Sequence, residues 1–259
     1  RGIAAISVVL FHYFFRYNQI YTHENISSNL FSYSKYGIGL FFIISGFVIL
    51  WSLSNIKKPL DFIVSRFSRL YPVYWAAISF TFLFVSLIGL PGREVTITTF
   101  FGNFLMFHNY FNIPHVDGVY WTLSIELTFY LWMLIIFSLK LLKRIDFISL
   151  FTLIISALFH FKVITLSDIM IDLLFIRWSV FFIIGISLYK IFVKETNLLT
   201  YINIIVALAL IFHIFELKSL IICSSITLVI YLGTNGYLGF LKNHILRFIG
   251  TISYSLYLI

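Results

Sequence analysis

Two chemically active side chains interrupt the apolar stretch that opens the chain. Arg1 and His12 stand eleven positions apart within RGIAAISVVLFHYFF. At about 100° per residue, this separation brings them to within roughly 20° of each other around a helix and sets them about 16 Å apart along its axis. A guanidinium and an imidazole inside a bilayer are costly unless they line a protein interior, a cavity or a pathway. The pair therefore indicates function, with His12 as a candidate general base.

An acidic residue follows within the segment GVYWTLSIELTFYLW. Tyr120 and Trp121 are typical of a membrane interface, and Glu126 lies about one helical turn further in. A carboxylate at that depth needs a partner from another span, and His12 is a candidate. A histidine oriented by Glu126 could deprotonate a hydroxyl nucleophile. The alternative is a structural hydrogen bond between helices.

A pair of arginines precedes the third apolar segment, in SRFSRLYPVYW. Arg66 and Arg69 are spaced i, i+3, so on a short helix they face the same way. Two guanidiniums together could clamp a polyphosphate through bidentate hydrogen bonds. The alternative is anchoring at the cytoplasmic surface against anionic lipid. Tyr71 follows, and Pro72 suits the first turn of the next span.

Three further patterns could support a site. Ser45 could offer a hydroxyl, but its neighbours Gly37, Gly39 and Gly46 favour an interpretation as close helix packing. Tyr254, in ISYSLYLI, belongs to a polar stripe or to interhelical hydrogen bonds. The outer-loop residues His108, His115 and Asp117 match no metal-binding signature, and we expect no metal.

Composition defines the elements that must position these residues. The chain has 259 residues, of which 61% are hydrophobic and 11% charged, and its mean hydropathy is +1.00. These values predict an all-α, polytopic integral membrane bundle of one domain over residues 1–259, and they exclude a nucleic-acid-binding protein. The single cysteine, Cys223, permits no intrachain disulfide.

The apolar segments predict about nine spans in the bilayer. The segment 98–107 is too short to cross and is predicted to be re-entrant or interfacial. The nine segments are 1–15, 36–53, 72–90, 118–139, 146–163, 172–190, 200–215, 217–234 and 245–259.

Basic residues then predict the orientation. The connections after the second, fourth, sixth and eighth segments carry eleven Lys and Arg residues, and the alternate connections carry six. The positive-inside rule places the first group in the cytoplasm. Arg1 is then near the cytoplasmic end of its helix, and His12 lies toward the outside.

Taken together, five stretches resemble the membrane acyltransferase 3 family, which includes O-antigen acetylases. The opening segment resembles its first-helix signature, carried here by Arg1 and His12, and GIGLFFIISGFVI resembles the second-helix signature. SRFSRLYPVYW resembles its Arg-x-x-Arg motif, VYWTLSIELTFYLW its Trp-Ser-Leu-Ser-Ile-Glu-Glu-Gln-Phe-Tyr stretch, and LRFIGTISYSLYLI its closing segment. Thr122 stands where the family usually has serine, and Leu127 and Thr128 replace its second glutamate and its glutamine.

The resemblance implies transfer of an acyl group, often acetyl, from a cytoplasmic coenzyme A thioester to a hydroxyl of a carbohydrate such as O-antigen or exopolysaccharide. It implies His12 and Glu126 as catalytic residues, with His12 as either a base or a transient carrier of the acyl group, and Arg66, Arg69 and Arg1 as residues that bind the coenzyme. We expect substrate-binding or supporting roles for Ser45, Tyr71, Trp121, Ser124 and Tyr254. The resemblance also implies a fragment that lacks both ends, an intact domain of roughly ten spans, and a location in the bacterial inner membrane.

Two other classes of protein compete with an acyltransferase. A transporter or flippase could use the same ionisable residues as a path for a glycan or a small anion. No internal repeat or matched pair of Gly- and Pro-broken helices supports that alternative. A membrane scaffold would leave Arg1, His12 and Glu126 without a role.

Overall fold

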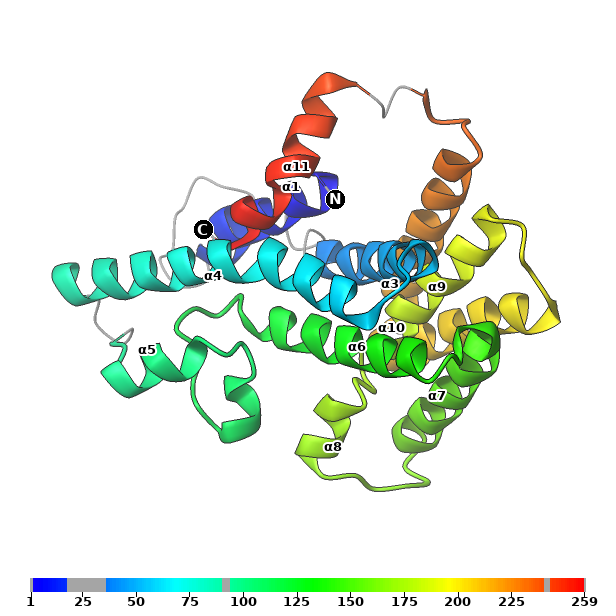
Figure 1. Cartoon of the computed structure of the whole chain (residues 1–259), viewed down its shortest axis with the longest axis horizontal. Coiled ribbons are helices and arrows are strands. Elements are labelled where there is room, and N and C mark those ends of the chain that lie inside the picture. The colour runs from blue at the N-terminus through cyan, green and yellow to red at the C-terminus, as the bar shows by residue number, and fades with distance from the viewer. Residues whose placement is uncertain (1, 18–35, 90–93, 240–242, 259) are drawn as a thin grey trace.

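The computed structural model describes residues 2–17, 36–89, 94–239 and 243–258, and the elements it describes are all helical (Figure 1). Arg1 and most of the predicted outer loop 16–35 lie outside the described residues. The helices are α1 (Gly2–Leu10), η1 (Phe11–Arg16), α3 (Gly37–Asn55), α4 (Pro59–Ile88), α5 (Ile97–Asn103), η3 (His108–Phe111), α6 (Trp121–Ser138), η4 (Leu142–Arg144), α7 (Ile145–His160), α8 (Asp168–Leu173), α9 (Ser179–Phe192), α10 (Leu198–Thr234) and α11 (His244–Leu258).

Four of these helices, α3, α4, α6 and α10, are long and apolar enough to cross a membrane. Two shorter apolar helices, Gly2–Arg16 and Ser179–Phe192, accompany them. Many large apolar side chains of the long helices are exposed, among them Leu87 on α4 and Ile205 on α10. A lipid environment accounts for such exposure, because a soluble surface rarely carries so much apolar area. The membrane class is thus confirmed, and the larger number of about nine spans stays a prediction.

Two predicted boundaries are wrong. The third segment was expected to begin at Pro72, but α4 begins at Pro59 and runs through Pro72. Pro59 takes the early position that proline favours, so Arg66 and Arg69 belong to the body of a long helix. The segment 172–190 begins as a helix only at Ser179, because Phe175 adopts a positive φ of 39° that ends α8.

A break inside α10 matches the predicted boundary between the segments 200–215 and 217–234. Glu216 has φ 73° and ψ 173°, which no helix accommodates, so α10 consists of two arms. Figure 1 shows the two arms diverging from this point.

Glycines bring α3 and α9 into close contact at the centre of the bundle. A Cβ atom at Gly46 would overlap the carbonyl oxygen of Phe182, and one at Gly185 would overlap that of Ile43. The aromatic rings of Phe42 and Phe182 stack beside this crossing with centroids 4.7 Å apart. The close packing predicted for the glycines of α3 is therefore confirmed.

A buried carboxylate joins α7, α9 and α10 at one end of the molecule. Asp146 forms an ion pair with Lys190 and accepts hydrogen bonds from Asn197 (2.9 Å) and Thr200 (3.1 Å). Asn203 donates to the Asp146 backbone carbonyl at 3.0 Å. A buried charge with this many partners holds the three helix ends in one arrangement.

The first and last described helices pack against each other. α1 and α11 lie side by side in Figure 1, and a Cβ atom at Gly2 would lie 3.0 Å from the backbone nitrogen of Gly250. α1 also contacts α3, where a Cβ at Gly37 would lie 3.0 Å from the Cβ of Ser7. The helix that carries His12 is thereby attached to the helices around Glu126.

Candidate active site

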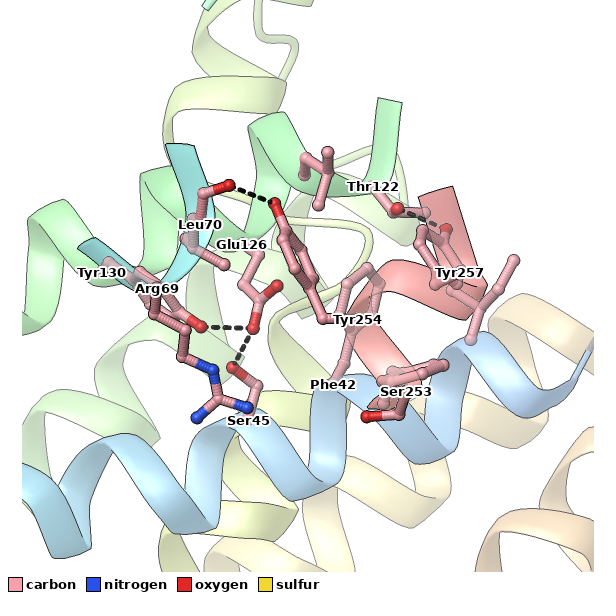
Figure 2. A pocket seen from close by; sticks show the side chains of 13 residues that line it. Phe42, Ser45, Arg69, Leu70, Thr122, Glu126, Tyr130, Ser253, Tyr254 and Tyr257 are labelled. Atoms are coloured by element: carbon pink, nitrogen blue, oxygen red, sulfur yellow. Dashed lines mark hydrogen bonds between the residues drawn. The ribbon is translucent and has the colours of Figure 1, made fainter. Parts of the chain in front are cut away.

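A hollow between α3, α4, α6 and α11 contains an acidic and a basic side chain (Figure 2). We call it the Glu126 hollow. Its polar lining residues are Ser45, Arg69, Thr122, Glu126, Tyr130, Ser253, Tyr254 and Tyr257. Four helices, taken from between Gly37 and Leu258, therefore supply one polar cluster inside an apolar bundle, an arrangement that rarely persists without function.

The Glu126 carboxylate accepts two hydrogen bonds in this hollow. Ser45 donates from Oγ to Oε1 at 2.8 Å, and the Tyr130 hydroxyl donates to the same oxygen. Tyr130 follows Glu126 by four residues, so one face of α6 presents both side chains. Ser45 comes from α3 next to Gly46, where the absence of a side chain allows α3 its close approach to α9.

The two arginines of α4 take different positions. Arg69 lines the Glu126 hollow, and its guanidinium lies on the same side of the Glu126 carboxylate as Ser45 (Figure 2). Arg66 donates to Ser52 Oγ at 3.1 Å and lies 5.5 Å from the Phe62 ring centroid and 6.0 Å from that of Tyr130. The buried Nε of Arg66 has no hydrogen-bond partner among the described residues. Arg66 thus approaches the hollow from beside Tyr130 without lining it.

Tyrosines of α11 close the other side of the hollow. The Tyr254 hydroxyl donates to the Leu70 carbonyl at 3.1 Å, and the Tyr257 and Thr122 hydroxyls are 2.5 Å apart. These bonds join α11 to α4 and to α6. Tyr254, predicted as a supporting residue, therefore lines the hollow and also connects α11 to α4 through its hydrogen bond.

His12 lies in η1 and makes no hydrogen bond with Glu126 among the described residues. Its electrostatic partners are Asp117, in the connection before α6, and Arg16. Its ring also meets Phe11 at 5.4 Å. The direct contact expected between His12 and Glu126 is thus not present in this structure, and the catalytic roles of both residues stay predictions.

Three predicted supporting residues lie outside the Glu126 hollow. The Tyr71 hydroxyl donates to the Leu105 carbonyl at 3.2 Å, and Ser124 donates to the Met106 carbonyl at 2.6 Å. Trp121 packs against Trp178, with ring centroids 5.1 Å apart. Trp121 and Ser124 occupy the opposite face of α6 from Glu126 and line a second hollow there.

The histidines between α5 and α6 bind each other. His108 Nε2 and His115 Nδ1 are 2.5 Å apart, and burial together with the neighbouring His115 lowers the pKa of His108 to about 4. The pair is therefore neutral near pH 7. Within the described ranges, no three His, Cys, Asp or Glu side chains are grouped as metal ligands would be.

Sequence reasoning missed Tyr130, Thr122 and Tyr257 as parts of the site. The i, i+4 spacing of Glu126 and Tyr130 was the one available signal, because it places a phenol on the same helical face as a buried carboxylate. The Thr122–Tyr257 contact had no such signal, since it depends on how α6 and α11 are rotated toward each other.

These observations define a polytopic, all-helical membrane protein with a charged cluster between its helices. A family model described as an acyltransferase domain, that of the acyltransferase 3 family, matches residues 1–259. The chain therefore belongs to this family and is a membrane acyltransferase. Neither a curated protein nor a solved structure matches the chain.

Proposed function

We propose that the chain transfers an acyl group, in the first instance acetyl, from an acyl-coenzyme A to a hydroxyl of a cell-surface carbohydrate such as O-antigen or exopolysaccharide. The observation that carries the proposal is the convergence of Arg69, Glu126 and Tyr130 in one hollow of a member of the acyltransferase 3 family. The hollow offers a cation for an anionic donor and hydroxyl and carboxylate groups for a proton-transfer reaction.

His12 is the general base in this proposal. It takes the proton of the acceptor hydroxyl while that oxygen attacks the thioester carbonyl carbon. The tetrahedral intermediate then collapses with cleavage of the carbon–sulfur bond, and the departing thiolate takes the proton from His12. Asp117 interacts electrostatically with this imidazole.

Glu126 supports the reaction from the hollow. Both of its hydrogen bonds use Oε1, so Oε2 has no bonded partner among the described residues and is available to a reactant. The carboxylate also offsets the charge of Arg69 in a low-dielectric interior. In the proposal, a bond from Oε2 to His12 during the reaction would orient the imidazole.

Arg66 and Arg69 bind the phosphates of the coenzyme in the proposal. Arg69 lies about 15 Å along the α4 axis from Pro59, the first residue of the helix. At that depth Arg69 lines the same hollow as Glu126. The unpaired buried Nε of Arg66 supplies a donor for a phosphate oxygen. Arg1, predicted at the cytoplasmic end of the first segment, would assist in binding the coenzyme.

The proposal is tested by transfer of radiolabelled acetyl from acetyl-CoA to envelope glycan in membranes that contain the protein. We expect His12→Ala and Glu126→Gln to reduce transfer at least about 100-fold, since a positioned acid or base contributes roughly that much. His213→Ala is the matched control, because His213 is an exposed imidazole that stacks on Phe161 on another helix pair.

Each outcome separates the alternatives. Normal transfer by a well-inserted His12→Ala variant removes His12 from the mechanism. Absence of transfer from acetyl-CoA by the wild-type protein directs the assay to longer acyl-CoA donors. If those fail as well, a transporter or flippase is the better interpretation of the charged hollow.

A further inference from the structure

A second hollow lies on the opposite face of α6 from Glu126. We call it the tryptophan hollow. Its volume is about 240 Å³. Its lining comes from η3, the first turns of α6, α8 and the connection before α9, and its main residues are Asn109, Tyr110, Trp121, Asp172, Arg177 and Trp178.

Two indole rings form its apolar wall. The Trp121 and Trp178 rings are tilted by 44°, with their centroids 5.1 Å apart. Trp178 is held on its other sides by Phe42 (5.5 Å) and Phe215 (5.7 Å). Fixed, half-buried aromatic surfaces of this kind bind a flat apolar face at little entropic cost.

Polar side chains also line the hollow, and two of them, Asp172 and Arg177, are exposed. The side chains of Asn109, Asp172 and Arg177 make no hydrogen bond among the described residues, and neither do the indole N–H groups of Trp121 and Trp178. Arg177 interacts electrostatically with Asp172 but forms no ion pair with it in the described chain. The hollow therefore presents a carboxylate, an amide, a guanidinium and two indole donors to whatever enters it.

This combination selects a polyhydroxylated ring over other ligands. A purely apolar ligand, such as a lipid chain, would leave these polar groups unpaired, at a cost of about 1–3 kcal/mol for each group that becomes buried. A phosphate would meet Arg177 but also the carboxylate of Asp172, whose charge repels it. A neutral sugar has an apolar face for the indoles and hydroxyls that both donate and accept.

The hollow is also well placed for an acceptor. Asp117, which acts on His12, precedes Trp121 by four residues. A residue that interacts electrostatically with His12 and a residue that lines the tryptophan hollow thus lie about one helical turn apart in sequence. We propose that the tryptophan hollow binds a neutral sugar ring of the acceptor glycan, at a distance from the hydroxyl that receives the acyl group. This inference rests on the proposed function, because it assumes that the acceptor is a carbohydrate.

Kinetics of the full chain in nanodiscs test the inference, with a soluble envelope polysaccharide fraction as the acceptor. We expect Trp178→Ala and Asp172→Asn each to raise KM for the polysaccharide at least about tenfold, with a smaller change in kcat, since they remove binding remote from the reacting atoms. Trp51→Phe is the control, because Trp51 is exposed on α3 and lines neither hollow. If loss of the Trp178 ring impairs folding, Asp172→Asn still tests the hollow, because Asp172 is exposed and asparagine has nearly the same size.

Equilibrium binding of the same fraction, followed by tryptophan fluorescence, needs no acyl transfer. Binding by the wild type that Asp172→Asn weakens at least about tenfold supports the hollow even if no transfer occurs, and the proposed function alone then fails. Transfer with an unchanged KM in Trp178→Ala and Asp172→Asn overturns the hollow and leaves the proposed function intact. Absence of both transfer and binding overturns both.

Discussion

Glu126 shows how an isolated carboxylate is kept within an apolar bundle. Its hydrogen bonds to Ser45 and Tyr130 supply part of the solvation lost on burial, and Arg69 lines the same hollow with the opposite charge. Such partners reduce the cost of burying a carboxylate among apolar side chains. Glu126 therefore connects α6 to α3 through Ser45 and also lines the hollow.

Removal of the Arg69 guanidinium should weaken use of the donor. We expect Arg69→Ala to raise KM for acetyl-CoA at least about tenfold while KM for the glycan changes less, because a bidentate phosphate contact is worth more than about 1.4 kcal/mol. Arg69→Lys should recover part of the loss, since it restores the charge without the planar fork. The measurement is initial rates over a range of both substrates.

The control for Arg69 is Arg144→Ala. Arg144 is an exposed arginine of the predicted cytoplasmic connection η4, and its removal changes net charge equally without touching the hollow. Equal KM values for acetyl-CoA in Arg69→Ala and the wild type would contradict the phosphate role.

The sequence allowed a partial prediction of the site at this scale. Glu126, Arg69, Ser45 and Tyr254 were all singled out, and they meet in one hollow. Tyr71 and Ser124 were also singled out but bond to backbone carbonyls elsewhere. Spacing along one helix defines a face, but the rotation of each helix against its neighbours decides which faces meet.

The packing of α3 against α9 depends on a close helix crossing that only glycine permits. At Gly46 and Gly185 the backbones of α3 and α9 are too close for any side chain. Gly46 could be predicted from its place in a small-residue run, whereas Gly185 had no such context. The start of α4 at Pro59 could not be predicted well, because the Lys and Arg residues of 57–69 favour a surface loop by composition.

We expect Gly46→Ala to destabilise the protein by about 1–3 kcal/mol or more, since the added methyl group forces α3 and α9 apart. Thermal unfolding in detergent should show a Tm lowered by roughly 2–4 °C per kcal/mol. Gly118→Ala is the control, because a Cβ there meets nothing within 4 Å. A Gly46→Ala variant as stable as Gly118→Ala would show that the crossing relaxes without cost.

The whole molecule has two distinct ends that agree with the predicted orientation. Helix ends assigned to the outside gather around Trp178, which contacts Trp121, Phe42 and Phe215. Ends assigned to the cytoplasm gather around Asp146 and Lys190. The alternation of basic connections thus groups the ends as the structure does, although the side of the membrane stays a prediction.

Single-cysteine labelling tests that orientation. With the sole cysteine removed by Cys223→Ala, we expect an impermeant maleimide to label Gly118→Cys in intact cells. Lys143→Cys, exposed at the other end, should react only after permeabilisation. The reverse pattern would place Arg69 and the donor on the opposite side of the membrane.

The pairing of α1 with α11 has a consequence for the synthesis of the protein. His12 is in η1, which directly follows α1, and Ser253, Tyr254 and Tyr257 come from α11. At about 5–20 residues per second, roughly 10–50 s separate the emergence of these two helices from the ribosome. During that interval the Glu126 hollow lacks one wall. An incomplete chain therefore lacks the wall that α11 supplies, and we expect premature termination before α11 to abolish acyl transfer.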